Sequence, residues 1–126
     1  EALDKRVWLK SGGFLVIEQT EACAVIDVNS GKYVAKRDTG EMAARINREA
    51  AREILRQIRL RNLSGIILVD FINMNQEEQE QLLALMRGLA KEDRITTRAV
   101  DVTELGIMEL TRRKEKKTLA QQLEEL

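Results

Sequence analysis

The 126-residue sequence has no histidine, no proline and a single cysteine, Cys23. Without histidine, the chain has no imidazole for acid–base catalysis or metal binding. One cysteine cannot form an internal disulfide, and because Cys23 lies in an apolar run we expect it to be a small core residue. The 21 basic and 21 acidic side chains cancel to a net charge of zero. Any nucleic-acid-binding surface must therefore be local rather than spread over the whole chain.

Long apolar stretches and a recognisable signal peptide are also missing, so we expect a cytoplasmic protein without a membrane span. What is present is an ordinary globular composition, with 44% hydrophobic and 33% charged residues. A chain of this length is predicted to form one domain, residues 1–126, with a core of its own.

Three β-strands are predicted in the first thirty residues. Apolar runs at 7–10 and 14–18 flank a glycine pair, which favours a hairpin, and a third strand is expected at about 22–28. Because side chains alternate between the two faces of a strand, Asp27 is expected on the face opposite the more apolar stripe of that third strand.

Helices and strands are predicted to alternate in the rest of the chain. The expected elements are a helix at 41–60, a strand at 66–69, a helix at 76–91 opened by a capping box at 75–78, a strand at 95–102 and a charged C-terminal helical extension at 105–126. The uninterrupted apolar strand at 66–69 is expected to be covered on both faces. The predicted fold class is α/β (α+β), with a mixed sheet of about five strands and elements in the order βββαβαβα. The first strands are expected to be antiparallel, and the later ones parallel with helices crossing between them.

Two aspartates stand in or at the end of segments that otherwise have the pattern of buried strands. Asp27 lies within 24–31 and Asp70 ends 65–70. A buried carboxylate is costly unless it is paired, protonated or bound to a metal, and sites in open sheets collect at the carboxyl ends of strands. If the two strands are neighbours, the carboxylates repel by roughly 4 kcal/mol at 4 Å and an effective dielectric of 20.

Such a pair of carboxylates suits a hard divalent cation, Mg²⁺ or Mn²⁺. The bound cation can neutralise a scissile phosphate and activate a water. Asn29 follows Asp27 by two residues, and its amide can hydrogen-bond the Asp27 carboxylate and orient it. The alternative, favoured on the pattern alone, is that Asp27 and Asp70 only cap turns at strand ends.

A short basic segment follows these residues. Lys32, Lys36 and Arg37 are placed to hold the phosphate backbone of a single strand beside the metal, although a solvated loop is the alternative. Solvent-facing positions are expected for the basic run at 112–117 and for the arginines of the 41–60 helix.

The few large aromatic residues allow two roles. Core packing is expected of Trp8, Phe14 and Phe71, with stacking on nucleic-acid bases as the alternative.

A series of motifs, taken together, resembles consecutive signatures of the ribonuclease E/G family. They are Ser11-Gly12-Gly13, Ile17 to Ala22, Ile26 to Gly31, Asn47 to Ala51, Gln57 to Arg61, Gly65 to Ile67 and Val69 to Ile72. They are similar to the deoxyribonuclease-I-like catalytic subdomain of that family, and the expected sheet is RNase H-like in outline. The resemblance implies that Asp27 and Asp70 bind catalytic Mg²⁺ and that Asn29 supports Asp27. Asn73 stands where the family often has a second acid.

The resemblance further implies a subdomain excised from a longer metal-dependent endoribonuclease that cleaves single-stranded RNA in RNA processing and mRNA decay. The family's S1 domain, its sensor of the RNA 5′ end and its zinc-linking Cys-x-x-Cys are not expected within this sequence, so no zinc site is expected here. The alternatives are a non-catalytic RNA-binding or oligomerisation scaffold and, on the traditional subdomain name alone, a deoxyribonuclease.

Overall fold

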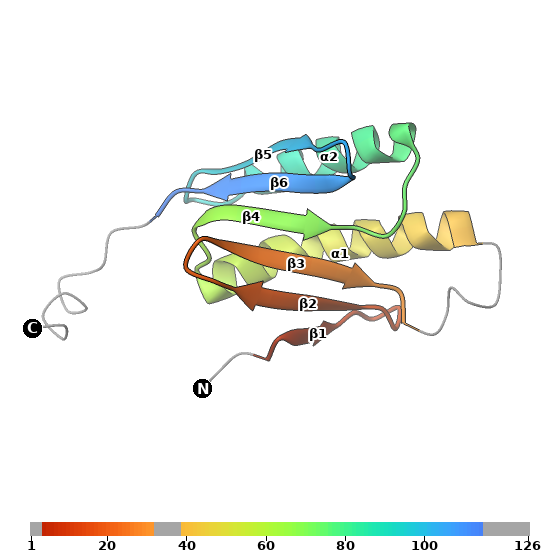
Figure 1. Ribbon diagram of the computed structural model, residues 1–126, viewed down its shortest axis with the longest axis horizontal. Helices are drawn as coiled ribbons and strands as arrows, with labels where there is room; N and C mark the ends of the chain where they lie inside the picture. Colours follow the sequence, from red (N-terminus) through yellow and green to blue (C-terminus); the bar gives the residue numbers. More distant parts are fainter. Residues whose placement is uncertain (1–3, 32–38, 115–126) are drawn as a thin grey trace, which may run out of the picture.

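The computed structural model describes residues 4–31 and 39–114. The elements in chain order are β1 (Arg6–Trp8), β2 (Phe14–Gln19), β3 (Cys23–Asn29), α1 (Thr39–Arg61), β4 (Gly65–Asp70), α2 (Gln76–Ala90), β5 (Thr97–Val102) and β6 (Ile107–Arg112). Figure 1 shows one sheet with both helices behind it. The face of the sheet turned away from α1 and α2 carries Asp27 and Asp70 and is called the open face below.

The sheet contains six strands in the spatial order β1-β2-β3-β4-β6-β5. Among the described strands, β3 and β4 form the one parallel pair, and α1 makes the crossover between them. Because parallel strands run in the same direction, the carboxyl ends of β3 and β4 meet at the same edge of the sheet. The mixed α+β class and the hairpin of the first two strands are confirmed.

The hydrophobic core fills the space between the sheet and the helices. The helix predicted at 41–60 is confirmed, and it packs one face against the sheet, because Ile46, Ala50, Ile54 and Ile58 recur at four-residue spacing and are all buried. The second helix begins at the predicted capping box, in which the Asn75 side chain accepts from the Glu78 backbone N–H and the Glu78 carboxylate accepts from that of Asn75. This reciprocal pair satisfies backbone donors of the first turn that have no partner within the helix.

The prediction that β4 is covered on both faces is wrong. Ile67 and Val69 are fully buried, but Ile66 is 51% exposed and Leu68 is only partly buried. Both helices pack on the same side of the sheet, so the side chains that alternate to the open face have no layer above them among the described elements.

The predicted helical extension from residue 105 is wrong over Ile107–Arg112, which forms strand β6. Gly106, with φ of 89°, closes a turn in which its N–H donates to the Thr103 carbonyl at 2.9 Å. Met108 and Leu110 then alternate into the core, which is a strand pattern. The remainder of that prediction, residues 115–126, lies outside the described residues.

The insertion of β6 also explains the strand count and order. It pairs antiparallel with β4 on one side and with β5 on the other, so β5 does not lie beside β4 as a second parallel strand. The sheet has six strands rather than about five, in the sequence order βββαβαββ.

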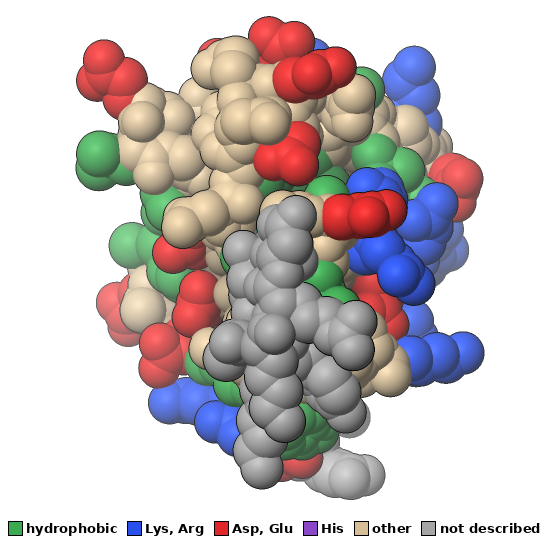
Figure 2. Space-filling view, turned by 90° about the vertical axis from the view of Figure 1, so that its right-hand side faces the viewer, with side chains coloured by type: hydrophobic (Ala, Val, Ile, Leu, Met, Phe, Trp, Pro, Cys, Tyr) green, Lys and Arg blue, Asp and Glu red, His purple; other side chains and the backbone are tan. Residues whose placement is uncertain are grey.

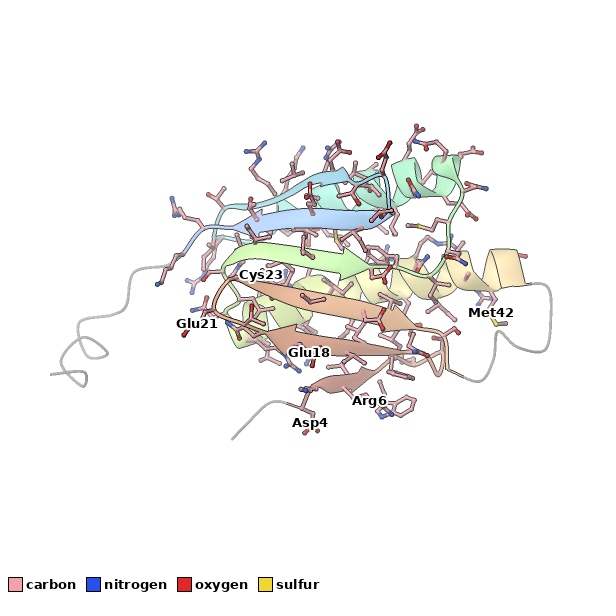
Figure 3. The ribbon with its side chains drawn as sticks, in the orientation of Figure 1. Asp4, Arg6, Glu18, Glu21, Cys23 and Met42 are labelled. Atoms are coloured by element: carbon pink, nitrogen blue, oxygen red, sulfur yellow. The ribbon has the colours of Figure 1, made fainter. Side chains whose placement is uncertain are left out.

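Two expectations about single side chains are also wrong. Cys23 is partly exposed on the open face rather than in the core, as Figure 3 shows. Trp8 is 63% exposed and Phe14 is partly exposed, whereas Phe71 is buried as predicted. No helix within residues 4–31 and 39–114 is long and apolar enough to cross a membrane.

Candidate metal centre

Asp27 and Asp70 lie side by side at the carboxyl ends of the parallel strands β3 and β4, where they are direct register partners. Neighbouring strands are roughly 4.8 Å apart, and register partners project their side chains from the same face. Both aspartates are exposed on the open face, whereas Ile26 and Val69, which precede them, are buried on the helix side. The expectation that these strands are neighbours and bring the two acids together is confirmed.

The two carboxylates influence each other electrostatically. Partial burial raises the pKa of Asp27 above its ordinary value of 3.8, and the charge of Asp70 raises it further. Both effects disfavour the ionised form of Asp27. The pair is therefore an unfavourable arrangement by itself, and a bound cation would relieve it.

The donor set fits Mg²⁺ or Mn²⁺ and does not fit a structural zinc site. In the described ranges no three or more His, Cys, Asp or Glu side chains cluster, and histidine is absent from the whole sequence. Mg²⁺ typically takes one or two carboxylates and completes its octahedron with water and substrate phosphate oxygens. Structural zinc requires four ligands, mostly Cys and His. Asp27 and Asp70, exposed on the open face, match the first description.

Asn29 is the last residue of β3, and its side chain closes the turn that follows. Its Oδ1 accepts a hydrogen bond from the Gly31 N–H at 3.0 Å. No hydrogen bond joins Asn29 to Asp27 in the described part of the chain, so the predicted contact between them stays a prediction. The amide nitrogen of Asn29 is the group of that side chain that can donate to a carboxylate.

Glycines allow the β1–β2 loop to pack against this turn. Gly31 has φ of +70°, and a Cβ added there would lie 2.6 Å from the Gly12 carbonyl oxygen. A Cβ added to Gly13 would lie 2.8 Å from the Asn29 carbonyl oxygen. Only glycine fits at position 31, where the backbone is left-handed, and at both positions a side chain would collide with the facing carbonyl oxygen. The Ser11-Gly12-Gly13 loop therefore supports the backbone that carries Asn29.

Helix α1 ties the loops on both sides of the site to the scaffold. Glu49 accepts a hydrogen bond from the Ser11 N–H at 3.2 Å. Asn47, only 1% exposed, donates from Nδ2 to the Ile72 carbonyl and accepts from the Ile72 N–H, both at 3.0 Å. Ile72 follows Asp70 by two residues, so Asn47 fixes the path of the chain where it leaves β4.

The role of Asn47 was not predicted. The signal was present, because Asn47 stands four and seven residues before two buried positions of α1, Ala51 and Ile54, and so faces the core. An amide at a core-facing position requires a hydrogen-bond partner, but the sequence does not identify which backbone segment supplies it.

The basic residues divide into two groups. Lys32, Lys36 and Arg37 lie outside the described residues, so their role beside the metal stays a prediction. The α1 arginines within 41–60 are exposed as predicted, and Arg48 and Arg52 line a cavity of about 180 Å³ between α1 and α2. Figure 2, which looks onto the edge where β3 and β4 end, shows basic side chains gathered on the helix side of the molecule.

A six-stranded mixed sheet covered by helices on one face, with two aspartates paired at the ends of its parallel strands, defines an α+β domain with a candidate divalent-cation centre. The chain belongs to the Ribonuclease E/G family, whose family model matches residues 1–115. The resemblance inferred from the sequence motifs is therefore confirmed.

Individual relatives agree with this assignment. The chain is 46% identical over 120 residues to ribonuclease G of Haemophilus influenzae and 42% identical to ribonuclease G of Escherichia coli K12. It is 44% identical over 120 residues to ribonuclease E of Synechocystis sp.. Each match covers 94% of this chain, which spans 24% of either ribonuclease G and 18% of the ribonuclease E.

Proposed function

We propose that this chain is the catalytic subdomain of a longer Mg²⁺-dependent endoribonuclease that cleaves single-stranded RNA in RNA processing and mRNA decay. The observation that carries the proposal is the register pairing of Asp27 with Asp70 at one edge of the sheet, in a chain of the Ribonuclease E/G family. The similar curated proteins are named as ribonucleases, which favours RNA over DNA as the substrate.

In this proposal Asp27 and Asp70 hold Mg²⁺, or Mn²⁺ in its place. The bound ion supplies positive charge to the phosphate and lowers the pKa of a coordinated water. Both carboxylates are exposed on the open face, so solvent and an RNA phosphate could reach an ion held between them. Asn29 orients Asp27 through its amide NH₂, and Asn47 holds the exit of β4 so that Asp70 keeps its register.

The other parts of the proposed enzyme lie beyond these two strands. Lys32, Lys36 and Arg37 guide the RNA backbone to the metal, an assignment that rests on their place in the sequence. Because the chain spans about a quarter or less of its relatives, RNA 5′-end sensing and S1-type binding belong to other domains of the parent enzyme. Assembly into a homo-oligomer and action in the cytoplasm are part of the same proposal.

The deciding experiment is Asp70→Asn in the full-length enzyme, assayed on single-stranded RNA in Mg²⁺. We expect cleavage to fall about 100-fold or more, because one of two metal ligands is weakened. Asp101→Asn removes the same charge from an exposed position of β5, which β6 separates from β4, and should leave the rate unchanged. Unfolding in urea checks that both variants are folded. Unchanged cleavage by Asp70→Asn contradicts the proposal, and equal cleavage of a matched DNA strand contradicts the assignment to RNA.

A non-catalytic scaffold is the second candidate, favoured only for the isolated chain because most of the relatives' length is missing from it. Paramagnetic Mn²⁺ separates the two candidates in an NMR titration. Selective broadening of the Asp27 and Asp70 signals supports the metal centre, whereas uniform broadening or none supports the scaffold.

A further inference from the structure

We propose that Arg6, Trp8 and Phe14 form a base-stacking site for single-stranded RNA next to the aspartate pair; we call these three residues the aromatic platform. This inference rests on the proposed function and adds to it a place where a nucleobase of the bound strand is held.

The platform is a preformed group of side chains. Trp8, the chain's single tryptophan, is 63% exposed although it is the largest apolar side chain available for burial. The Trp8 and Phe14 ring centroids are 5.0 Å apart with the ring planes tilted by 55°. The Arg6 guanidinium carbon lies 4.3 Å from the Phe14 ring centroid and 5.7 Å from that of Trp8. Phe14 and Arg6 thus limit the motion of Trp8 while leaving most of it open to solvent.

Strand register places the platform on the same face as the two acids. Arg6 pairs with Val16, Val16 pairs with Asp27, and Asp27 pairs with Asp70, so one row of partners crosses the sheet from Arg6 to Asp70. The neighbouring row, nearer the carboxyl end of β3, contains Trp8, Phe14 and Asn29.

The two rows are close enough for a single RNA strand to contact both. From the spacing of strands and of residues along them, the Cα atoms of Phe14 and Asp27 are roughly 8 Å apart. Figure 3 shows Arg6 on β1, at the margin of the open face. A strand whose phosphate lies at Asp27 and Asp70 can therefore reach Trp8 with a nearby base.

The chemistry of the platform matches a nucleobase better than an aliphatic partner. Aromatic side chains bind unpaired bases by stacking, with little dependence on base identity, and an arginine beside the ring adds cation–π attraction and a donor for phosphate. A second protein copy docked over Trp8 would have to bury the Arg6 charge, for which the described residues show no carboxylate partner. A single-stranded RNA supplies both the flat base and the negative charge.

The test measures RNA binding by the full-length enzyme in the Asp70→Asn background, so that the strand stays uncut. The probe is a short single-stranded RNA with 2-aminopurine at successive positions, whose fluorescence reports stacking. We expect Trp8→Ala to weaken binding about tenfold and to abolish the fluorescence change at one position. Trp8→Leu keeps the apolar bulk and should behave like Trp8→Ala, whereas Trp8→Phe should retain most of the affinity. Ile66→Ala is the matched control, because Ile66 is 51% exposed on the same face.

An abasic nucleotide at the responding position provides the second arm. RNA lacking that base should bind with equal affinity whether or not Trp8 is substituted. Equal affinity of the intact RNA for Trp8 and Trp8→Ala proteins overturns the inference. A loss of affinity on Trp8 substitution that persists with abasic RNA also overturns it. So does a change in oligomer mass with RNA affinity unchanged, because that result assigns the surface to a second copy of the chain. Failure of the proposed function is a separate result, since it appears as RNA cleavage by Asp70→Asn itself.

Discussion

At the scale of single residues, Asn47 shows how a buried amide can control a site that it does not touch. Its two hydrogen bonds join α1 to the backbone of Ile72, immediately after the β4 aspartate. Within the described residues no buried side-chain polar atom lacks a hydrogen-bond partner, so this amide belongs to a fully satisfied interior. Satisfied polar groups of this kind specify one arrangement of the chain, because any other leaves them unpaired.

We expect Asn47→Leu to lower the free energy of unfolding by about 2–4 kcal/mol. The substitution is close in volume, but it leaves the Ile72 N–H and carbonyl without their partner, at about 1–3 kcal/mol each. Urea denaturation measures the loss. Asn73→Ala, an exposed position on the same loop, should change stability by no more than about 0.5 kcal/mol. A loss below about 1 kcal/mol for Asn47→Leu would show that the two hydrogen bonds do not hold the loop.

Residue patterns predicted the orientation of Asp27 but not the exposure of Trp8. The period-two alternation of β3 is local, so it places Asp27 opposite the buried Ile26 and Val28 before any partner strand is known. Trp8 is an apolar residue of the kind expected in a core, and its exposure depends on its pointing from the edge strand β1 to the open face, which neither helix covers. That is a property of the whole sheet.

At the scale of elements, a buried ion pair joins β6 to the turn before β5 and to the end of α1. Arg112 Nε lies 2.8 Å from Asp93 Oδ2, with side chains 3% and 1% exposed. The same guanidinium donates to the Asn62 Oδ1 at 3.0 Å and to the Leu63 carbonyl at 2.9 Å. The expectation that Arg112 faces solvent as part of the basic run at 112–117 is wrong, because the strand pattern of β6 turns its side chain inward.

This ion pair predicts an acid-dependent loss of stability. Burial by itself would raise the pKa of Asp93, but hydrogen bonds from Arg112, the Ile95 N–H and Thr97 outweigh it and hold the pKa below 3.8. A carboxyl whose pKa is lower in the folded than in the unfolded state stabilises the fold at any pH above its pKa in the unfolded state. That contribution to stability is lost as the pH falls through the pKa of the folded state. Chemical denaturation between about pH 7 and pH 3 should therefore show stability falling below about pH 4.

Asp93→Asn isolates the pair. It should cost about 3–5 kcal/mol at pH 7, because Arg112 stays buried without a counter-charge, and the remaining acid dependence should be shallower. Glu18→Gln breaks the exposed Lys5–Glu18 pair, whose side chains are 71% and 57% exposed, and should cost less than about 1 kcal/mol. Equal losses for the two variants would contradict the assignment of Arg112 to the core.

At the scale of the whole molecule, both helices lie on one face of the sheet and the two aspartates lie on the other. Burying the helix face supplies the stability, and the open face is free to carry charge. The carboxylate pair opposes folding slightly, and the cation of the proposed function would relieve that repulsion. A ligand that binds the folded state alone raises its stability according to its concentration and dissociation constant.

We therefore expect Mg²⁺ to raise the melting temperature of the chain, by an amount equivalent to about 1.4 kcal/mol at ten times its dissociation constant. NaCl at matched ionic strength is the control for general screening. Asp27→Asn should abolish the Mg²⁺-specific part of the shift while leaving the fold intact. If Mg²⁺ raises the melting temperature of Asp27→Asn by the same amount, the cation binds elsewhere. If Mg²⁺ does not raise the melting temperature of the native chain, the proposed metal centre is contradicted.

The sequence by itself determined α1 and α2, the first strands, the face on which Asp27 lies and the family, because periodicity and motif order are carried by neighbouring residues. Only the tertiary structure decided that β6 inserts beside β4, that Arg112 is buried, that Trp8 is exposed, and that Asp27 and Asp70 are register partners. Hydrophobic burial is non-directional, so a pattern of apolar residues states which side of a strand is covered but not which strand lies next to it. That choice depends on contacts between residues far apart in the chain, and here it brings the two carboxylates together.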